Sequence, residues 1–380
     1  MNSKVSKKKN IAIVTWLGNG NYGTSLQSFA LHKKLQVLGY NVCFLKYVQS
    51  SFNYKNFIKF VLSKIRIDSD NWKSLIFRPL VSAKQAKLSR FISENYNIHK
   101  PINTKRELQK LLAETDVFVT GSDQIWNTKY HFDPFFFLEF AGNSKRIAYA
   151  SSIGLQDFPE EHKAKLKTLL ASFSHIGLRE TTAVNAVSNL LKRDDVIQVL
   201  DPTFLLDSQE WTYVSASAMI ECEVPKKFIF CYLIGNNEEY KEQLKKVMKY
   251  TGIKDVVIIP AAENMDFCVE GALVYHDAGP LEFIKLIKES LFVCTDSFHA
   301  TALSLNFNKN FVEFMRFKDA DNASQNSRIY DVLSHYDLMD RIYSDKTTEW
   351  SRNIDFTYSN KQLEEDRKKS LDYLVNAIEN

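Results

Sequence analysis

The segment LFVCTDSFHATALSL, residues 291–305, decides how the rest of the chain is interpreted. Its first four residues form a short apolar run, which indicates a buried parallel strand. Apolar residues at helical spacing from Ala300 onward predict the start of a helix, with Asp296 or Ser297 as its N-cap. His299 lies in the turn between strand and helix. Because ligands of open α/β folds bind at this edge of the sheet, we expect a functional site here.

Apolar strands and helical patterns alternate on both sides of this segment. The sequence predicts further strands at residues 11–16, 42–47, 117–120, 147–151, 176–178, 196–200, 228–234, 256–259, 272–276 and 311–314. Such alternation is typical of parallel sheets that are covered on both faces. The break at Asp201-Pro202-Thr203 predicts a linker that reaches Pro225, and therefore two α/β domains that face each other across a cleft.

The domain boundaries follow from this break. We predict an N-terminal domain over residues 1–205 and a C-terminal domain over 206–350, which carries the TDSFHA turn. Residues 351–380 form an amphipathic helix that packs back on a domain. Its predicted apolar face carries Leu363, Leu371, Leu374 and Ile378.

Length and composition exclude several classes of protein. A chain of 380 residues favours two domains, and 45% hydrophobic with 25% charged residues is typical of a globular protein. The net charge of +4 is too small to indicate nucleic acid as a partner. Five scattered cysteines without a CxxC pair indicate reduced, mostly buried thiols and no zinc site. With neither a signal core nor an apolar run of about 18 residues, we predict a cytoplasmic protein.

The segment 51–110 is helical in pattern and basic. Between residues 55 and 100 it contains ten Lys or Arg against three acids, with aromatic residues between them. One interpretation is a set of solvated helix faces with buried aromatics. The other is a face that contacts an anionic membrane or a diphosphate-linked acceptor, with the protein peripheral at the inner face of the membrane.

A glycine-rich loop, GNGNYG at residues 18–23, follows the first predicted strand. Its spacing matches GxGxxG, but Lys46 and Tyr47 occupy the place where a dinucleotide site would have an acid. We therefore interpret the loop as a backbone surface for another ligand, and we predict no NAD. The residues of this loop that we expect to bind substrate are Asn21, Tyr22 and Gly23.

Three charged residues follow predicted strands and form a candidate catalytic set: Asp123, Arg179 and His299. A carboxylate can accept a proton from a sugar hydroxyl, a guanidinium can bind a phosphate or carboxylate, and an imidazole can donate a proton near neutral pH. Two other interpretations stay open: Asp123 as the cap of the next helix, and Arg179 with Glu180 as a surface ion pair. No HExxH, Walker or DxD-like motif predicts a metal-dependent mechanism.

Five segments of the chain resemble the polysaccharide pyruvyl transferase family. In family order they are NYGTSLQSFAL at 21–31, VFVTGSDQIWN at 117–127, GLRE at 177–180, DPTFLL at 201–206 and TDSFHATAL at 295–303. The resemblance implies two Rossmann-like domains facing across a cleft, the GT-B-like arrangement, with the acceptor on the N-terminal side. It also implies transfer of pyruvate from phosphoenolpyruvate, a co-substrate, onto two hydroxyls of one sugar in a surface polysaccharide precursor. A cyclic ketal forms, phosphate is released and no cofactor is required.

Carried over to this chain, the family's acid, arginine and histidine fall on Asp123, Arg179 and His299. We expect His299 to be the proton donor, Asp123 the base and Arg179 the clamp on the donor's phosphate or carboxylate. A helix N-terminus disfavours a charged imidazole, so the acid role needs Asp296 or the bound dianion nearby. The further residues expected at the substrates are Gly121, Ser122, Asp296, Ser297, Arg316 and Arg328.

Two other functions stay open. One is a GT-B-type glycosyltransferase that uses a nucleotide sugar, and the other is a non-catalytic glycan-binding protein of an assembly complex. The chain also departs from some family members at Thr24, where they carry an acid after Asn-x-Gly. The acceptor sugar, whether lipid-linked or free, therefore stays unassigned.

Overall fold

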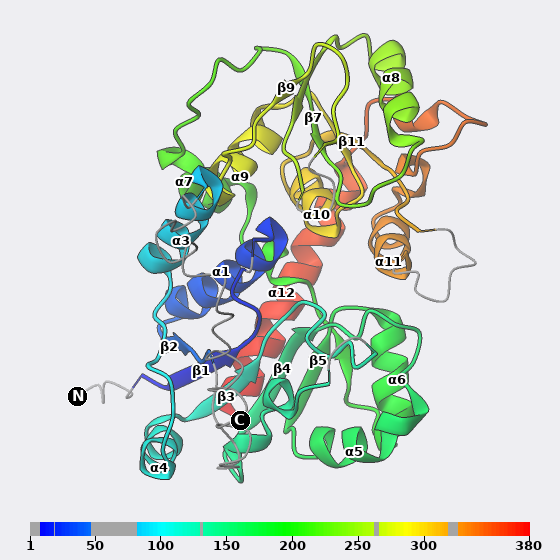
Figure 1. The fold of residues 1–380 in the computed structure, drawn as a ribbon. Helices are drawn as coiled ribbons and strands as arrows, with labels where there is room; N and C mark the ends of the chain where they lie inside the picture. The colour runs from blue at the N-terminus through cyan, green and yellow to red at the C-terminus, as the bar shows by residue number, and fades with distance from the viewer. Residues whose placement is uncertain (1–7, 19, 47–81, 130–131, 262–265, 318–325) are drawn as a thin grey trace, which may run out of the picture.

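Two parallel β-sheets, one in each half of the chain, form the framework of the protein (Figure 1). The computed structural model describes residues 8–18, 20–46, 82–129, 132–261, 266–317 and 326–380. The strands are largely buried and helices cover the sheets, as the alternating sequence pattern predicts. The predicted α/β class, with one Rossmann-like parallel sheet in each half of the chain, is confirmed.

The N-terminal sheet has six parallel strands in the order β2-β1-β3-β4-β5-β6. They are β1 (Asn10–Val14), β2 (Asn41–Phe44), β3 (Val117–Thr120), β4 (Arg146–Ser151), β5 (His175–Leu178) and β6 (Ile197–Gln198). The chain leaves β1 towards β2 and later returns on the other side of β1 as β3. The carboxyl ends of β1 and β3 therefore border a switch point, where open α/β sheets bind ligands. Thr15 and residues 121–123 lie at this edge.

The C-terminal sheet has five parallel strands in the order β11-β10-β7-β8-β9. They are β7 (Phe228–Tyr232), β8 (Asp255–Ile258), β9 (Leu273–Val274), β10 (Phe292–Thr295) and β11 (Asn310–Glu313). Its switch point lies between β7 and β10, because the chain runs outward from β7 on one side and returns at β10 on the other. Residues 296–299 follow β10 directly and lie at this second edge.

Helices connect the strands in both halves. The N-terminal half contains α1 (Tyr22–Val37), α3 (Ala83–Asn95), α4 (Lys105–Glu114), α5 (Glu160–Leu170), α6 (Thr181–Leu191) and the 3₁₀ turns η2 (Pro134–Phe137) and η3 (Glu139–Ala141). The C-terminal half contains α8 (Tyr240–Thr251), α9 (Pro280–Glu289), α10 (Phe298–Asn306), α11 (Ser327–His335) and the 3₁₀ turns η7 (Met339–Arg341) and η8 (Glu349–Ser351).

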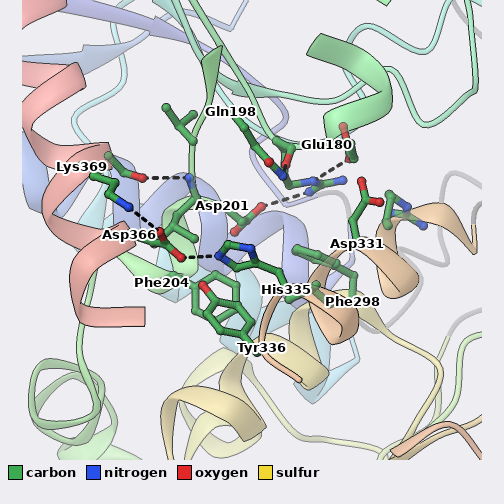
Figure 2. A pocket seen from close by; sticks show the side chains of 16 residues that line it. Glu180, Gln198, Asp201, Phe204, Phe298, Asp331, His335, Tyr336, Asp366 and Lys369 are labelled. Atoms are coloured by element: carbon green, nitrogen blue, oxygen red, sulfur yellow. Dashed lines mark hydrogen bonds and ion pairs between the residues drawn. The ribbon is translucent and has the colours of Figure 1, made fainter. Parts of the chain in front are cut away.

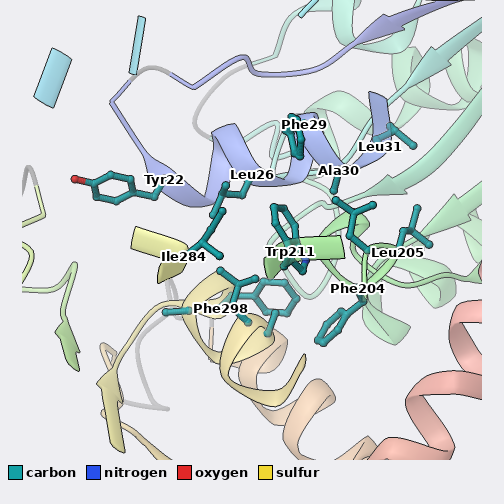
Figure 3. Packing of buried hydrophobic residues seen from close by; sticks show 14 of the residues in the cluster. Tyr22, Leu26, Phe29, Ala30, Leu31, Phe204, Leu205, Trp211, Ile284 and Phe298 are labelled. Atoms are coloured by element: carbon teal, nitrogen blue, oxygen red, sulfur yellow. The ribbon is translucent and has the colours of Figure 1, made fainter. Parts of the chain in front are cut away.

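A hydrophobic cluster that includes α1 joins the two halves (Figure 3). Most of α1 is buried on all sides, which is typical of a helix enclosed by protein. Tyr22 at its start stacks on Phe283 of α9, with ring centroids 4.7 Å apart, and its hydroxyl donates to the Ala278 carbonyl at 2.7 Å. The first turn of α1 is therefore held by the C-terminal half.

The connection between the sheets is helical and packed. It contains η4 (Pro202–Phe204), α7 (Ser208–Val214) and η5 (Ser215–Ser217), where the sequence predicts only a linker. Trp211 of α7 is completely buried, and its indole N–H donates to the Thr203 carbonyl at 2.9 Å. The predicted linker therefore does connect the two sheets, but it is helical, and Trp211 fixes it in the shared core.

The last helix, α12 (Thr357–Glu379), runs back along the N-terminal half (Figure 1). The Tyr373 hydroxyl donates to the Ala148 carbonyl of β4 at 2.9 Å, and the Leu200 N–H donates to Ser370 Oγ at 3.0 Å. The predicted domain boundaries, which divide the chain after residues 205 and 350, stay predictions.

The structure also bears on the predictions about the basic segment, the cysteines and membrane crossing. Residues 51–81 of the basic segment lie outside the described residues, and α3 and α4 form the helices of the remainder. All five cysteines are unpaired, but only Cys231 and Cys294 are buried. Among the described helices, none has the length and apolar character that crossing a membrane requires.

Candidate active site

The candidate site lies where the carboxyl edges of the two sheets approach each other. Asp123 follows β3, Arg179 follows β5, and His299 lies in the first turn of α10, which follows β10. The structure brings Arg179 and His299 onto one buried carboxylate, that of Asp201. Asp123 is linked to the same group, because the adjacent Ser122 hydroxyl donates to Asp201 at 2.9 Å. Residues from distant parts of the sequence therefore form one cluster.

Asp201 is the centre of this cluster. Its side chain has no exposed surface and accepts from Arg179 Nη1 at 3.0 Å and from the backbone N–H and hydroxyl of Thr203 at 2.9 and 2.8 Å. His299 Nε2 lies 3.7 Å from Asp201 Oδ2. Burial alone would raise the pKa of Asp201, but His299, Arg179 and the Thr203 N–H stabilise the carboxylate and hold this pKa far below its usual range.

Arg179 is held on both sides by carboxylates. Its Nε donates to Glu180 Oε1 at 2.9 Å, and its Nη1 donates to Asp201. The guanidinium carbon lies 4.5 Å from the ring centroid of Phe298. Burial opposes the charge of Arg179, but Glu180, Asp201 and Asp123 together raise its pKa. The alternative of a surface ion pair is wrong, because both Arg179 and Glu180 are buried.

One nitrogen of the Arg179 guanidinium takes no part in the hydrogen bonds to Glu180 and Asp201. Its Nη2 is buried and has no hydrogen-bond partner within the described ranges. A buried guanidinium N–H without a partner is costly, so the arrangement favours an acceptor oxygen supplied by a ligand. His299 Nε2 is buried and unpartnered in the same way, at 3.7 Å from the nearest Asp201 oxygen.

His299 is part of a helix and not of the preceding turn. Helix α10 begins at Phe298 with Ser297 as the N-cap residue, and no side chain caps it. The expected helix start at Ala300 is two residues too late, whereas Ser297, one of the two expected N-caps, is confirmed as the N-cap residue. Since the first backbone N–H groups of α10 lack a side-chain cap, they can bind an anion beside His299.

The imidazole of His299 packs against Gly23 of α1. A Cβ atom built on Gly23 would lie 2.1 Å from His299 Nδ1 and 2.5 Å from its Cγ. No side chain other than hydrogen fits this contact, so the predicted site residue Gly23 acts through its lack of a side chain. The ring is thus enclosed between α1 on one side and Asp201 on the other.

Asp123 has an unusual backbone, with φ of 77°. This left-handed conformation is uncommon for a residue with a side chain and is typical of functional loops. Thr24 donates to Asp123 Oδ2 at 2.7 Å, and the Gln124 N–H donates to Oδ1 at 2.9 Å. The next segment is a turn and not a helix, so the alternative role as a helix cap is wrong.

Asp296 does not face His299, contrary to the expectation that it supports the imidazole. It accepts from the Ile234 and Gly235 N–H groups at 2.7 Å each, from the Tyr240 hydroxyl at 3.0 Å and from Arg316 Nε at 3.3 Å. These donors draw the carboxylate towards the loop after β7, across the switch point of the C-terminal sheet. The carboxylate beside the imidazole is Asp201.

The other predicted substrate contacts differ in their surroundings. Asn21 caps α1 by accepting from the Thr24 N–H at 3.3 Å, and Tyr22 belongs to the core between the two halves. Gly121 is in tight contact with Thr15, since a Cβ there would lie 3.0 Å from Thr15 Cβ. Arg316 donates to the Asp296 carbonyl at 2.8 Å. Binding roles for these residues stay predictions.

Arg328 of α11 is buried near Arg179. Burial, together with the positive charges of Arg179 and Arg316, lowers the pKa of Arg328 to about 10. Two buried guanidinium groups that repel each other favour a bound anion, because the anion offsets the repulsion. Arg179, Arg328, Asp201 and Phe298 line one cavity of about 110 Å³, which we call the arginine cavity (Figure 2).

Asp201 and Glu180 were missed as site residues by sequence reasoning. Asp201 lies in the motif DPTFLL and follows β6, so its place after a strand was a usable signal. The adjacent Pro202 favoured the interpretation of a linker instead. Glu180 was noticed only as the neighbour of Arg179, although it also accepts from Ser152 Oγ at 2.6 Å.

Comparison with known proteins gives one family match and several similar folds. The family model described as polysaccharide pyruvyl transferase matches residues 21–315. No curated protein matches the sequence. Among solved structures, the UDP-GlcNAc 2-epimerase from Neisseria meningitidis bound to UDP-GlcNAc is 14% identical with a TM-score of 0.49, covering 97% of this chain and 100% of that one. A glycosyltransferase from Rickettsia africae ESF-5 is 11% identical with a TM-score of 0.49, covering 98% and 100%.

Proposed function

The chain belongs to the polysaccharide pyruvyl transferase family, and on this premise we propose a specific reaction. The protein transfers the pyruvyl group of phosphoenolpyruvate to two hydroxyls of one sugar in a surface polysaccharide precursor. The products are a cyclic ketal and inorganic phosphate. The sugar belongs to an exopolysaccharide or capsule precursor, lipid-linked or free, and the reaction takes place in the cytoplasm or at the inner face of the membrane.

One observation carries the proposal of a small anionic donor. Arg179 and Arg328 are both buried at the arginine cavity, and Arg179 Nη2 has no partner in the described part of the chain. The uncapped start of α10 adds backbone N–H groups at the same edge. Phosphoenolpyruvate carries a phosphate and a carboxylate, which match two guanidinium groups and a helix N-terminus. The volume of about 110 Å³ favours a small anion over a nucleotide sugar.

The chemistry then follows from charge. His299 donates a proton to the methylene carbon of the donor, which leaves C2 electron-poor, and the first sugar oxygen bonds to C2. The C2–O bond to phosphate breaks, and the second sugar oxygen closes the ring at the same carbon. Asp123 accepts the protons of the two hydroxyls. In the balanced reaction one of these protons ends on the new methyl group and the other on the released phosphate.

Asp201 supports both cationic groups in this scheme. It accepts from Arg179 and faces His299 Nε2, so it stabilises the positive charge that the imidazole carries before it donates its proton. This offsets the helix N-terminus of α10, which disfavours a charged imidazole. Asp201 thus takes the part for which the sequence offered Asp296 or the bound dianion.

The test is release of phosphate by the purified full chain. We expect release only when phosphoenolpyruvate and an acceptor saccharide are both present, and loss of release in His299→Ala with an unchanged melting temperature. Binding of a nucleotide diphosphate without binding of phosphoenolpyruvate would overturn the proposal in favour of a glycosyltransferase. Saccharide binding without consumption of either donor would instead indicate a glycan-binding protein.

A further inference from the structure

A second cavity, of about 590 Å³, lies beside the carboxyl end of β1. Its walls come from four segments: the described residues that follow β1, Lys46 after β2, one side of α3, and the η2 turn with the residue before it. The side chains that matter here are Trp16, Lys46, Gln85, Ser89, Asp133 and Phe136. We call it the aromatic cavity. It is much larger than the arginine cavity, and its volume lies in the range of ordinary ligand sites.

The lining of the aromatic cavity suits a sugar ring. Trp16 is half-buried, and its ring is held perpendicular to Phe136 with centroids 6.3 Å apart. A rigid aromatic wall can cover the apolar C–H face of a pyranose. Gln85 and Ser89 are exposed on α3, and Lys46 and Asp133 belong to the same lining. These side chains can donate hydrogen bonds to sugar hydroxyls or accept them beside the aromatic wall. An apolar face rimmed by polar groups matches the two-sided chemistry of a saccharide.

Hydrogen bonds connect this cavity to the catalytic cluster. Thr15 lines the aromatic cavity, and its hydroxyl donates to the Ser122 carbonyl at 2.8 Å. The hydroxyl of the same Ser122 donates to Asp201, which lines the arginine cavity. Ser122 is thus bonded to the lining of both cavities, and the next residue is Asp123. The expected base therefore follows directly in the chain on the residue whose hydrogen bonds link the two linings.

From this arrangement we infer that the aromatic cavity binds the acceptor saccharide, as an uncharged hexose or N-acetylhexosamine unit stacked on Trp16. The inference rests on the proposed function for its chemistry, since it assigns the second substrate of that reaction. The donor anion occupies the arginine cavity, and the acceptor hydroxyls approach Asp123 from the side of the switch point between β1 and β3. Gly20 keeps this side open, because a Cβ atom built there would meet nothing within 4 Å.

The experiment fills the aromatic cavity without touching the catalytic cluster. Ser89→Trp puts a large ring into the cavity from an exposed position on α3. Ser93→Trp makes the same change one helical turn further on, at an exposed residue outside the cavity lining, and is the matched control. The probes are the methyl glycosides of glucose, galactose, mannose, N-acetylglucosamine and N-acetylmannosamine, and saturation-transfer NMR on the full chain reports their binding.

We expect at least one glycoside to bind the wild type and Ser93→Trp equally, and to bind Ser89→Trp at least tenfold more weakly. Trp16→Ala should also weaken the binding of the same glycoside, with an unchanged melting temperature. Equal binding by Ser89→Trp and Ser93→Trp, or no binding of any glycoside to the wild type, would overturn the inference. Calorimetry with phosphoenolpyruvate separates the two proposals: if the donor binds no variant, the proposed reaction fails, while the glycoside comparison still decides the role of the cavity.

Discussion

Gly23→Ala tests the contact between α1 and the imidazole of His299. The added Cβ would lie 2.1 Å from His299 Nδ1, whereas ordinary contacts begin near 3.4 Å. The ring and the helix must therefore separate by about 1.3 Å, the difference between these two distances. Misplacing a catalytic group by about 1 Å costs roughly 100-fold in rate, or about 2.7 kcal/mol of activation free energy. We expect phosphate release to fall by about that factor.

The same substitution changes stability in a way that depends on His299. Overpacking a closed contact costs about 1–3 kcal/mol in the free energy of unfolding. When His299 is also replaced by Ala, the clash disappears and only the helix preference for Ala over Gly remains, which favours folding by up to about 1 kcal/mol. Gly23→Ala should therefore destabilise the wild type but not the His299→Ala variant.

A double-mutant cycle provides the assay. Urea unfolding of the wild type, both single variants and the double variant gives the coupling free energy between Gly23 and His299. We expect at least about 1 kcal/mol of coupling, and no further loss of activity when Gly23→Ala is added to His299→Ala. Retention of most of the activity by Gly23→Ala, or the same stability change in both backgrounds, would refute the described contact.

Two further predictions concern the charges of the cluster. Because the pKa of Asp201 in the folded protein lies well below its unfolded value of about 4, its contribution to stability is present above about pH 4 and is lost as the pH falls. Asp201→Asn should lower the free energy of unfolding at pH 7 by about 3–5 kcal/mol and make it depend less on pH below 5. Urea unfolding at several pH values measures this, and the same pH dependence in both proteins would contradict it. Phosphoenolpyruvate at 100 times its dissociation constant should stabilise the folded wild type by about 2.7 kcal/mol, which is seen as a rise in melting temperature. Arg328→Met should remove this rise. An equal rise in both would show that Arg328 does not contact the donor.

The sequence predicts the fold better than the site because the fold depends on local pattern. Buried apolar runs such as residues 117–120 and 291–294 are recognisable as parallel strands without knowledge of their neighbours, and they correspond to β3 and β10. The partner of a charged side chain depends on strand order, which local pattern does not contain. Asp201 meets Arg179 because β5 and β6 are adjacent, and it meets His299 because the two halves pack together.

The turn after β10 is a second case in which local pattern does not show the partner of a charged side chain. Its place after a buried strand is predictable, although α10 begins at Phe298 and not at Ala300, and sequence proximity alone makes Asp296 a plausible partner for His299. The loop after β7 offers two backbone N–H groups at 2.7 Å and therefore binds that carboxylate more favourably than the imidazole does. Since β7 is distant in the sequence, no local pattern reveals this competition.

The position of His299 depends on both domains at once. Its ring contacts Gly23 of the N-terminal half, and its Nε2 faces Asp201 in the connection between the sheets. Tyr22, next to Gly23, is in turn held by the Ala278 carbonyl and by Phe283 of the C-terminal half. A shift of one half relative to the other would therefore change the surroundings of the imidazole before it changed either sheet. Substitutions in this shared core should alter activity at a smaller loss of stability than substitutions inside either sheet, because the contact between Gly23 and the imidazole is the tightest among the described glycines.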